Sequence, residues 1–341
     1  MTTVEVPALA GLNPSSARLS HRPANRIDDL INEVDSLRAV QRDIRVNTRE
    51  LAIAPADGAL MVGGGERYPL RDHAFAQLCS RLKVPAPYAR RCDSGLRAQN
   101  LNRWLNEEDR NVLLRLERGE VRAVLSASYR AINHADILGW LADRLGVDTP
   151  IRYELTEGYL DMQVIRESPV QSLSDRGRQG LHRGIHLRNS EVGTARVRIS
   201  TLVFRSICLN GLILNGGSWS YSRRHVGKAD IASDVREAFD RAMALAGKAA
   251  EGLLETEGVE VADPLKVFDR IVTRYELSEG EDSAIRKAFL WEPGHTLWHV
   301  VNSLTRAGNA NDLPLDSRHR LQELGGRITS LASEGRRWLD N

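Results

Sequence analysis

Aromatic residues and long apolar runs are both scarce in this sequence of 341 residues. Phe, Trp and Tyr make up 5% of the chain, so its core must be mostly aliphatic. No apolar run approaches the roughly 18 residues that a membrane-spanning helix needs. The N-terminal segment also lacks the basic start and apolar stretch of a secretory signal. We therefore expect neither insertion into a membrane nor secretion.

Cysteine is almost absent. Cys79, Cys92 and Cys208 cannot all pair with one another, and no two of them have the C-x-x-C spacing of a metal site. This usage is typical of reduced thiols, so we expect a cytoplasmic protein.

Motifs of catalysis and of metal binding are missing as well. "MVGGGERY" is rich in glycine but is not a P-loop, and the sequence contains no G-x-S-x-G elbow. His182 and His186 are four residues apart in a strand-like context, which separates them by about 13 Å, too far to share one ion. We therefore predict no enzyme, no cofactor and no metal site.

The periodicity of the apolar residues predicts an α+β fold, with an antiparallel β-hairpin sheet packed on helices and a helical C-terminal region. A disordered tail is expected over 1–25, an α+β core over 26–228 and the helical region over 229–341. A first hairpin turns at Glu157-Gly158, and a second follows at "GIHLRNSEVGTARVRIS". Helices are predicted over 26–41, 69–84, 133–145, 231–253 and from 263 onward, with further short helices to the C-terminus.

Positive charge is concentrated in one segment of the chain. Between Arg166 and Lys228 there are eleven Lys and Arg residues but three acidic ones, so this segment carries +8 although the whole chain carries +2. Such a concentration favours an anionic partner.

The second hairpin places part of this charge on one face. We predict that Arg188 pairs with Arg196 and His186 with Arg198, so that these four residues share a face opposite an apolar one. Like charges opposite one another destabilise a sheet by up to about 1 kcal/mol per pair. A bound phosphate backbone would relieve this repulsion. Removal of the arginines would relieve it too, so this change is expected to leave the fold intact or even to stabilise it. A solvated polar face remains the simpler alternative.

Neighbouring residues extend the predicted nucleic-acid site. Arg223, Arg224, His225 and Lys228 follow in "SRRHVGK", where a face of serines and arginine can bind phosphates. Trp219 and Tyr221 lie on the other face and can stack on bases, although the core is the more usual place for such rings. A loop, "DRGRQGLHRG", adds Arg176, Arg178 and Arg183.

Four motifs carry a resemblance to a known family. In order and spacing, "LSASYRAINHADIL", "IHLRNSEVGTARVRI", "CLNGL" and "RRHVG" resemble the phage/plasmid-like proteins grouped as domain of unknown function nine-three-two. The resemblance extends from about Tyr68 to the last helix. Phages, prophages and plasmids typically encode such proteins. The resemblance also implies a distant similarity to single-strand annealing proteins of the Rad-fifty-two type. Those proteins hold one DNA strand in a basic groove on a β-sheet backed by a helix.

The sequence and the resemblance together lead to a functional hypothesis. We expect a DNA-binding protein of a mobile element that anneals single-stranded DNA without ATP, works as a homo-oligomeric ring or filament and can recruit a host single-strand-binding protein. Two alternatives stay open at this stage: an interaction protein, such as an inhibitor or scaffold, and a nuclease whose carboxylates converge only in the fold. The sequence does not distinguish DNA from RNA.

Overall fold

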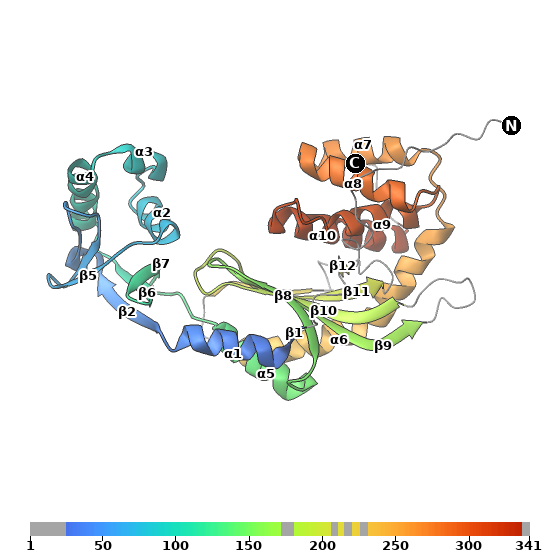
Figure 1. Ribbon diagram of the computed structural model, residues 1–341, viewed down its shortest axis with the longest axis horizontal. Helices are drawn as coiled ribbons and strands as arrows, with labels where there is room; N and C mark the ends of the chain where they lie inside the picture. Colours follow the sequence, from blue (N-terminus) through green and yellow to red (C-terminus); the bar gives the residue numbers. More distant parts are fainter. Residues whose placement is uncertain (1–24, 172–180, 206–210, 215–219, 226–230, 336–341) are drawn as a thin grey trace.

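The structure is a computed structural model that describes residues 25–171, 181–205, 211–214, 220–225 and 231–335. The tail predicted over 1–25 lies outside these residues except for its last position. The fold is α+β, as the sequence predicts, and it forms two lobes (Figure 1). Residues 41–126 make a smaller lobe, and the rest of the described chain makes a larger one. No helix in the described ranges is both long enough and apolar enough to cross a membrane.

The smaller lobe contains two small antiparallel sheets beside three helices. A cluster of aliphatic side chains fills it, with Leu78, Leu101 and Leu114 fully buried. Its elements are β2 (Gln41–Asn47), η3 (Thr48–Glu50), β3 (Leu51–Ile53), β4 (Leu60–Val62), β5 (Glu66–Tyr68), α2 (Asp72–Arg81), α3 (Ala86–Arg91), α4 (Ser94–Glu107), β6 (Asn111–Glu117) and β7 (Glu120–Ser126).

The larger lobe is built on a seven-stranded antiparallel sheet. Its strand order is β1-β8-β9-β10-β11-β12, and β13 also pairs with β11 beyond the end of β12. The strands are β1 (Asn25–Arg26), β8 (Pro150–Leu155), β9 (Leu160–Gln171), β10 (Leu181–Asn189), β11 (Val197–Arg205), β12 (Gly211–Leu214) and β13 (Ser220–Arg223).

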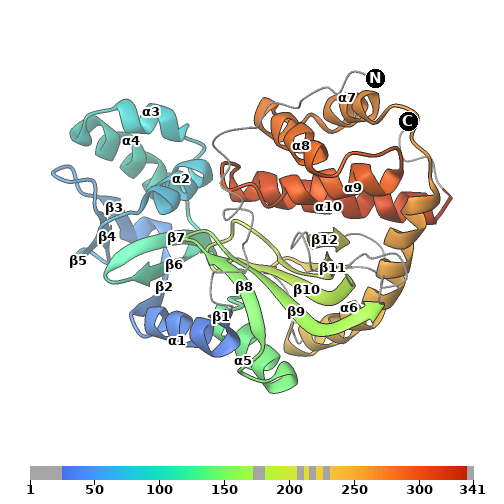
Figure 2. The ribbon, with the colours of Figure 1, turned by 45° about the vertical axis from the view of Figure 1, so that its right-hand side comes forward.

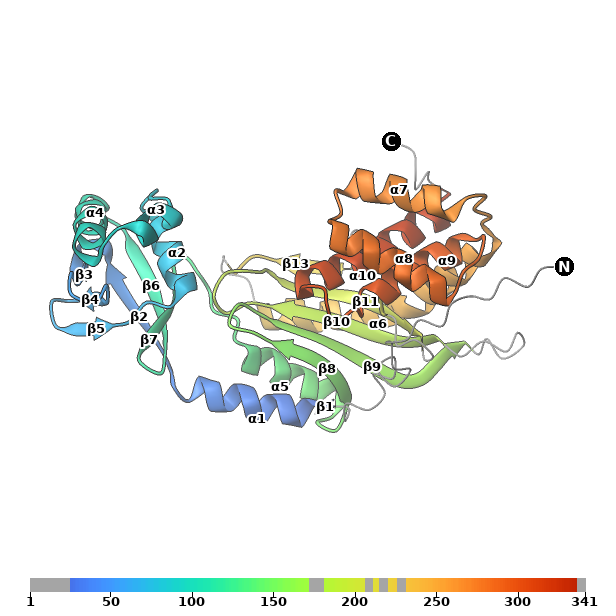
Figure 3. The ribbon, with the colours of Figure 1, turned by 45° about the horizontal axis from the view of Figure 1, so that its top comes forward.

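Helices cover both faces of this sheet. On one side, α1, α5 and the first part of α6 bury a common apolar cluster with β8–β11. On the other side α7–α10 form a helical layer (Figure 3), and α6 runs along the sheet toward that layer (Figure 2). The helices are α1 (Ile27–Arg38), α5 (His134–Leu145), α6 (Ile231–Glu255), η6 (Thr256–Gly258), α7 (Pro264–Tyr275), α8 (Glu279–Trp291), α9 (Leu297–Ala307) and α10 (Leu315–Ser333).

Several local predictions are confirmed. The hairpin of β8 and β9 turns at Glu157-Gly158, with Ile151 paired to Val164 and its apolar residues on the buried face. The side chain of Asp263 caps α7 by accepting a hydrogen bond from the amide of Lys266. Asn133 is the N-cap of α5, but its side chain makes no capping bond and instead accepts one from Arg115.

Candidate nucleic-acid interface

The second hairpin forms, but its register differs from the predicted one. Arg188 pairs with Arg198, not Arg196, and His186 pairs with Ser200, not Arg198. The physical reason lies in the loop that connects β10 and β11. This loop is longer than predicted, because hydrogen bonds to its own side chains stabilise the longer connection. The hydroxyl of Ser190 accepts hydrogen bonds from the amides of Val192 and Thr194. Since the shift is by two residues, the same side chains stay on each face.

The basic face of the hairpin is covered by α10. Two arginines of the sheet form ion pairs with acidic residues of this helix: Arg188 with Asp316 at 2.5 Å and Arg198 with Glu323 at 2.7 Å. The guanidinium of Arg188 also lies 4.0 Å from the centre of the Tyr159 ring. The repulsion that the sequence suggested is therefore relieved inside the chain, and these two arginines are not free for phosphate.

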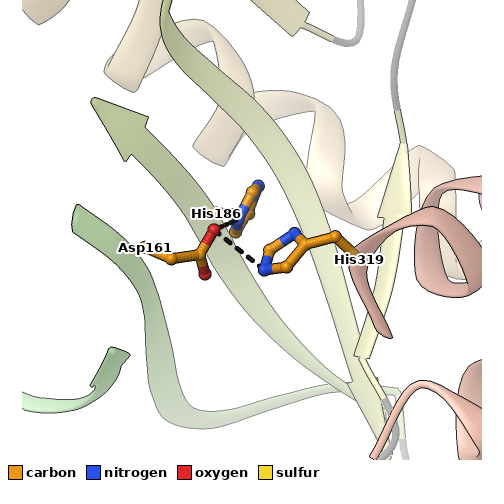
Figure 4. A group of neighbouring side chains, drawn as sticks. All are labelled: Asp161, His186 and His319. Carbon is orange, nitrogen blue, oxygen red and sulfur yellow. Dashed lines mark hydrogen bonds and ion pairs between the residues drawn. The ribbon is translucent and has the colours of Figure 1, made fainter. Parts of the chain in front are cut away.

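His186 lies deepest in this covered face. It is fully buried, and its Nε2 is 3.0 Å from a carboxylate oxygen of Asp161 on β9. His319 of α10 approaches the same oxygen at 2.8 Å (Figure 4). Burial lowers the pKa of His186, which keeps its imidazole neutral at pH 7. For Asp161, burial acts to raise the pKa, but the two imidazoles outweigh it and hold the pKa below its ordinary value. A buried neutral ring is no phosphate contact, so the prediction for His186 needs correction.

The strand β13 divides its side chains between two faces. Tyr221 and Arg223 point toward α6, where both contact the carboxylate of Asp234. Tyr221 is half-buried against the apolar cluster of the larger lobe, which agrees with the core alternative, and its role in base stacking stays a prediction. Ser222 and Arg224 alternate with them and are exposed. The predicted outward face of serine and arginine is thus present in this strand.

His225 lies two residues after the end of β13 and is buried. Its ring stacks on Tyr129, with 5.1 Å between ring centres and an interplanar angle of 4°. Its carbonyl accepts a hydrogen bond from the amide of Arg130, which ties β13 to the segment that links the two lobes. His225 is therefore a packing residue, and it brings Arg130 next to Arg224.

The "NSEVG" turn joins the two lobes (Figure 1). The carboxylate of Glu191 pairs with Arg122 of the smaller lobe at 3.1 Å and accepts the amide hydrogen of His134 at 2.8 Å. The side chain of Val192 enters a small apolar cluster with Leu113 and Leu125. We call this region, Asn189 to Gly193 with its contacts, the lobe joint.

Gly193 shows why the joint needs a glycine. Its φ is +80°, and a Cβ there would lie 2.9 Å from the side chain of Leu125.

Burial lowers the pKa of His134, whose amide bonds to Glu191, to about 4, so that ring is neutral within the joint. The most specific motif of the sequence is thus a docking element of the fold.

Three exposed arginines occupy neighbouring backbone positions beside the lobe joint. Arg196 and Arg224 each lie one residue beyond the paired residues Val197 and Arg223, and Arg130 is hydrogen-bonded to the residue after Arg224. Within the described ranges none of the three has a carboxylate partner, whereas Arg188, Arg198 and Arg223 all do. We call Arg130, Arg196 and Arg224 the arginine patch. Arg45 flanks it on the smaller lobe, where its guanidinium bonds to the carbonyl of Ala127.

The other predicted contacts fall elsewhere. Arg183 is exposed on β10 near α6, away from the patch. Arg176, Arg178, Trp219 and Lys228 lie outside the described residues.

Comparison with known proteins adds nothing to this geometry. No family model, no curated protein and no solved structure matches the chain. The resemblance to the phage/plasmid-like family therefore stays a prediction.

Two features of the site escaped the sequence reasoning. Arg130 joins the patch through a single backbone hydrogen bond, for which the sequence holds no signal. The sequence does hold a signal for the polar residues of α10 that cover the basic face. Along one stripe of this helix, polar residues recur at helical spacing: Asp316, His319, Gln322 and Glu323. A polar stripe beside an apolar one on a long helix indicates a partner that is polar too.

Proposed function

We propose that the protein binds single-stranded DNA through the phosphate backbone at the arginine patch and anneals complementary strands as a homo-oligomer without ATP. The observation that carries the proposal is the patch itself. In the described chain, its three arginines are exposed and lack acidic partners although most neighbouring cations are paired. The exposed hydroxyl of Ser222, one residue before the paired Arg223, adds a second kind of phosphate ligand.

The patch suits backbone contacts better than base reading. Arginine binds phosphate oxygens in a bidentate manner, and this interaction is independent of sequence. Binding should therefore tolerate any sequence, depend strongly on salt and leave the bases free to pair.

The test is a salt series with labelled single-stranded oligonucleotides. Each phosphate contact contributes about 0.7 to the slope of log affinity against log salt for a single strand. The variant Arg130→Gln/Arg196→Gln/Arg224→Gln should lower that slope by about 2 and should slow annealing of complementary strands in a fluorescence-transfer assay. An equal slope in wild type and variant would refute the patch.

A matched control removes the same charge elsewhere. The variant Arg26→Gln/Arg67→Gln/Arg103→Gln neutralises three exposed arginines that are all ion-paired and have no contact with the lobe joint or the arginine patch among the described interactions. It should retain the wild-type slope. If both variants lose binding equally, net charge and not the patch governs affinity. An oligoribonucleotide of the same sequence completes the design, and stronger binding to it would reassign the substrate to RNA.

A further inference from the structure

One cluster of side chains has the composition of a metal site. Asp161 of β9, His186 of β10 and His319 of α10 are buried, with relative exposures of 5%, 0% and 4%. One potential ligand atom from each lies within 4.8 Å of the other two. Figure 4 shows both imidazoles directed at the carboxylate between them. The three residues come from positions far apart in the sequence, so the fold alone brings them together.

The geometry is close to that of bound zinc. The Nε2 atoms of His186 and His319 lie 3.0 and 2.8 Å from the same oxygen of Asp161. In a tetrahedral site with zinc–ligand bonds of 2.0–2.1 Å, ligand atoms are about 3.3 Å apart. Each of the two nitrogen–oxygen distances is therefore a few tenths of an ångström shorter than the separation around a bound ion, and all three ligand atoms lie within 4.8 Å of one another. Two imidazoles and one carboxylate form a ligand set that zinc and similar divalent transition metals accept.

Without a metal, one oxygen of the buried Asp161 carboxylate is shared by two imidazoles. Each imidazole must then donate its Nε2–H to that oxygen. Within the described ranges Asp161 has no Lys or Arg partner, and Arg188, its cross-strand neighbour, pairs with Asp316. A dication would compensate the charge of the carboxylate directly.

We propose that Asp161, His186 and His319 bind one divalent transition metal, with zinc the best match, and that the metal fastens α10 to the sheet. Because all three ligands are buried, the site is structural. The second oxygen of Asp161 or a water completes the coordination. The inference is independent of DNA binding, since none of the ligands belongs to the arginine patch.

Cobalt provides the direct test. Untagged full-length protein is stripped with a strong chelator, dialysed and titrated with Co²⁺, whose visible absorption reports coordination by protein ligands. We expect one equivalent of Co²⁺ to bind, to be displaced by Zn²⁺ and to raise the melting temperature by several degrees. If no visible band develops when Co²⁺ is added to the stripped wild-type protein, the proposal is overturned. This result does not depend on any variant.

Variants then locate the ion. His319→Gln and Asp161→Asn should each abolish the band, whereas His295→Gln, which removes an exposed histidine outside the cluster, should leave it unchanged. A band that survives both cluster variants would place the metal elsewhere and refute the assignment. If the cluster variants fold poorly, the metal content of freshly purified wild-type protein, expected at one atom per chain, decides the matter on its own.

Discussion

Removal of the Glu191 charge tests whether the "NSEVG" turn holds the lobes together. The carboxylate is buried, with 4% of its side chain exposed, and it contacts Arg122 and the amide of His134. Loss of one partner from a buried ion pair costs about 3–5 kcal/mol. Arg122 retains Glu117 at 3.2 Å, which reduces the loss. In Glu191→Gln the amide oxygen still accepts from His134 while its NH₂ faces a guanidinium, so we expect destabilisation of about 3 kcal/mol.

This value converts into a measurable melting shift. With an unfolding entropy of about 2.1 cal/mol/K per residue, 3 kcal/mol corresponds to a decrease of about 4 °C. Calorimetry at pH 7 measures it, and Glu157→Gln, which alters an exposed acid that pairs with Arg71, serves as the control and should shift the melt by less than 1 °C. The double variant Arg122→Met/Glu191→Gln should lose less than the sum of the single variants, because the two residues are in contact. A shift below 1 °C in Glu191→Gln would show that the joint contributes little to stability.

Three further predictions follow from the described contacts. His134 has a folded-state pKa of about 4, below its unfolded value of about 6.5. Its contribution to stability is therefore complete above pH 6.5 and is lost as the pH falls toward 4. Unfolding in urea should show a free energy of unfolding about 2 kcal/mol lower at pH 5 than at pH 7, and this difference should be absent in His134→Gln. Gly326→Ala would place a Cβ 2.1 Å from the carbonyl oxygen of Ile213 and should cost about 3 kcal/mol or more, whereas Gly139→Ala in α5 meets no atom within 4 Å and should stabilise by up to about 1 kcal/mol, both measured by urea unfolding. Arg188→Ala should destabilise by about 1–2 kcal/mol in the same assay, opposite to the expectation from like-charge repulsion, because it removes a largely buried guanidinium that packs on the Tyr159 ring and bonds to Asp316.

The elements that the sequence predicted well are those set by local rules. A period of 3.6 identified α6, and a proline after Asp263 marked the start of α7. Alternation of apolar residues fixed both hairpin faces, since Ile185, Leu187 and Ile199 are all buried as predicted. These features depend on neighbours within a few residues, so one sequence suffices to find them.

The hairpin register and the fate of its charges depend on distant residues. The register follows from how the loop bonds to itself and from its contacts with both lobes, since Glu191 pairs with Arg122 of the smaller lobe and accepts the amide hydrogen of His134 of the larger lobe. Helix α2 ends at Arg81, three residues before the predicted end and ahead of the prolines of "PAPY", with Lys83 at a φ of +56°. Pro85 and Pro87 then begin α3, a helix that the sequence analysis did not predict. The register has no signal within the hairpin, whereas the proline in the first turn of α3 is a local signal that the prediction did not use.

The local charge of +8 is the clearest example of this limit. A segment sum treats cations as free, but α10 supplies Asp316 and Glu323 from more than 120 residues away, and α6 supplies Asp234. The same helix brings His319 to His186, which turns a predicted phosphate contact into part of a buried cluster. What remains for a polyanion is the subset of arginines at the edge that α10 does not cover. If the protein binds DNA, the strand must therefore run past the lobe joint at Arg130, Arg196 and Arg224, and not over the face of the hairpin.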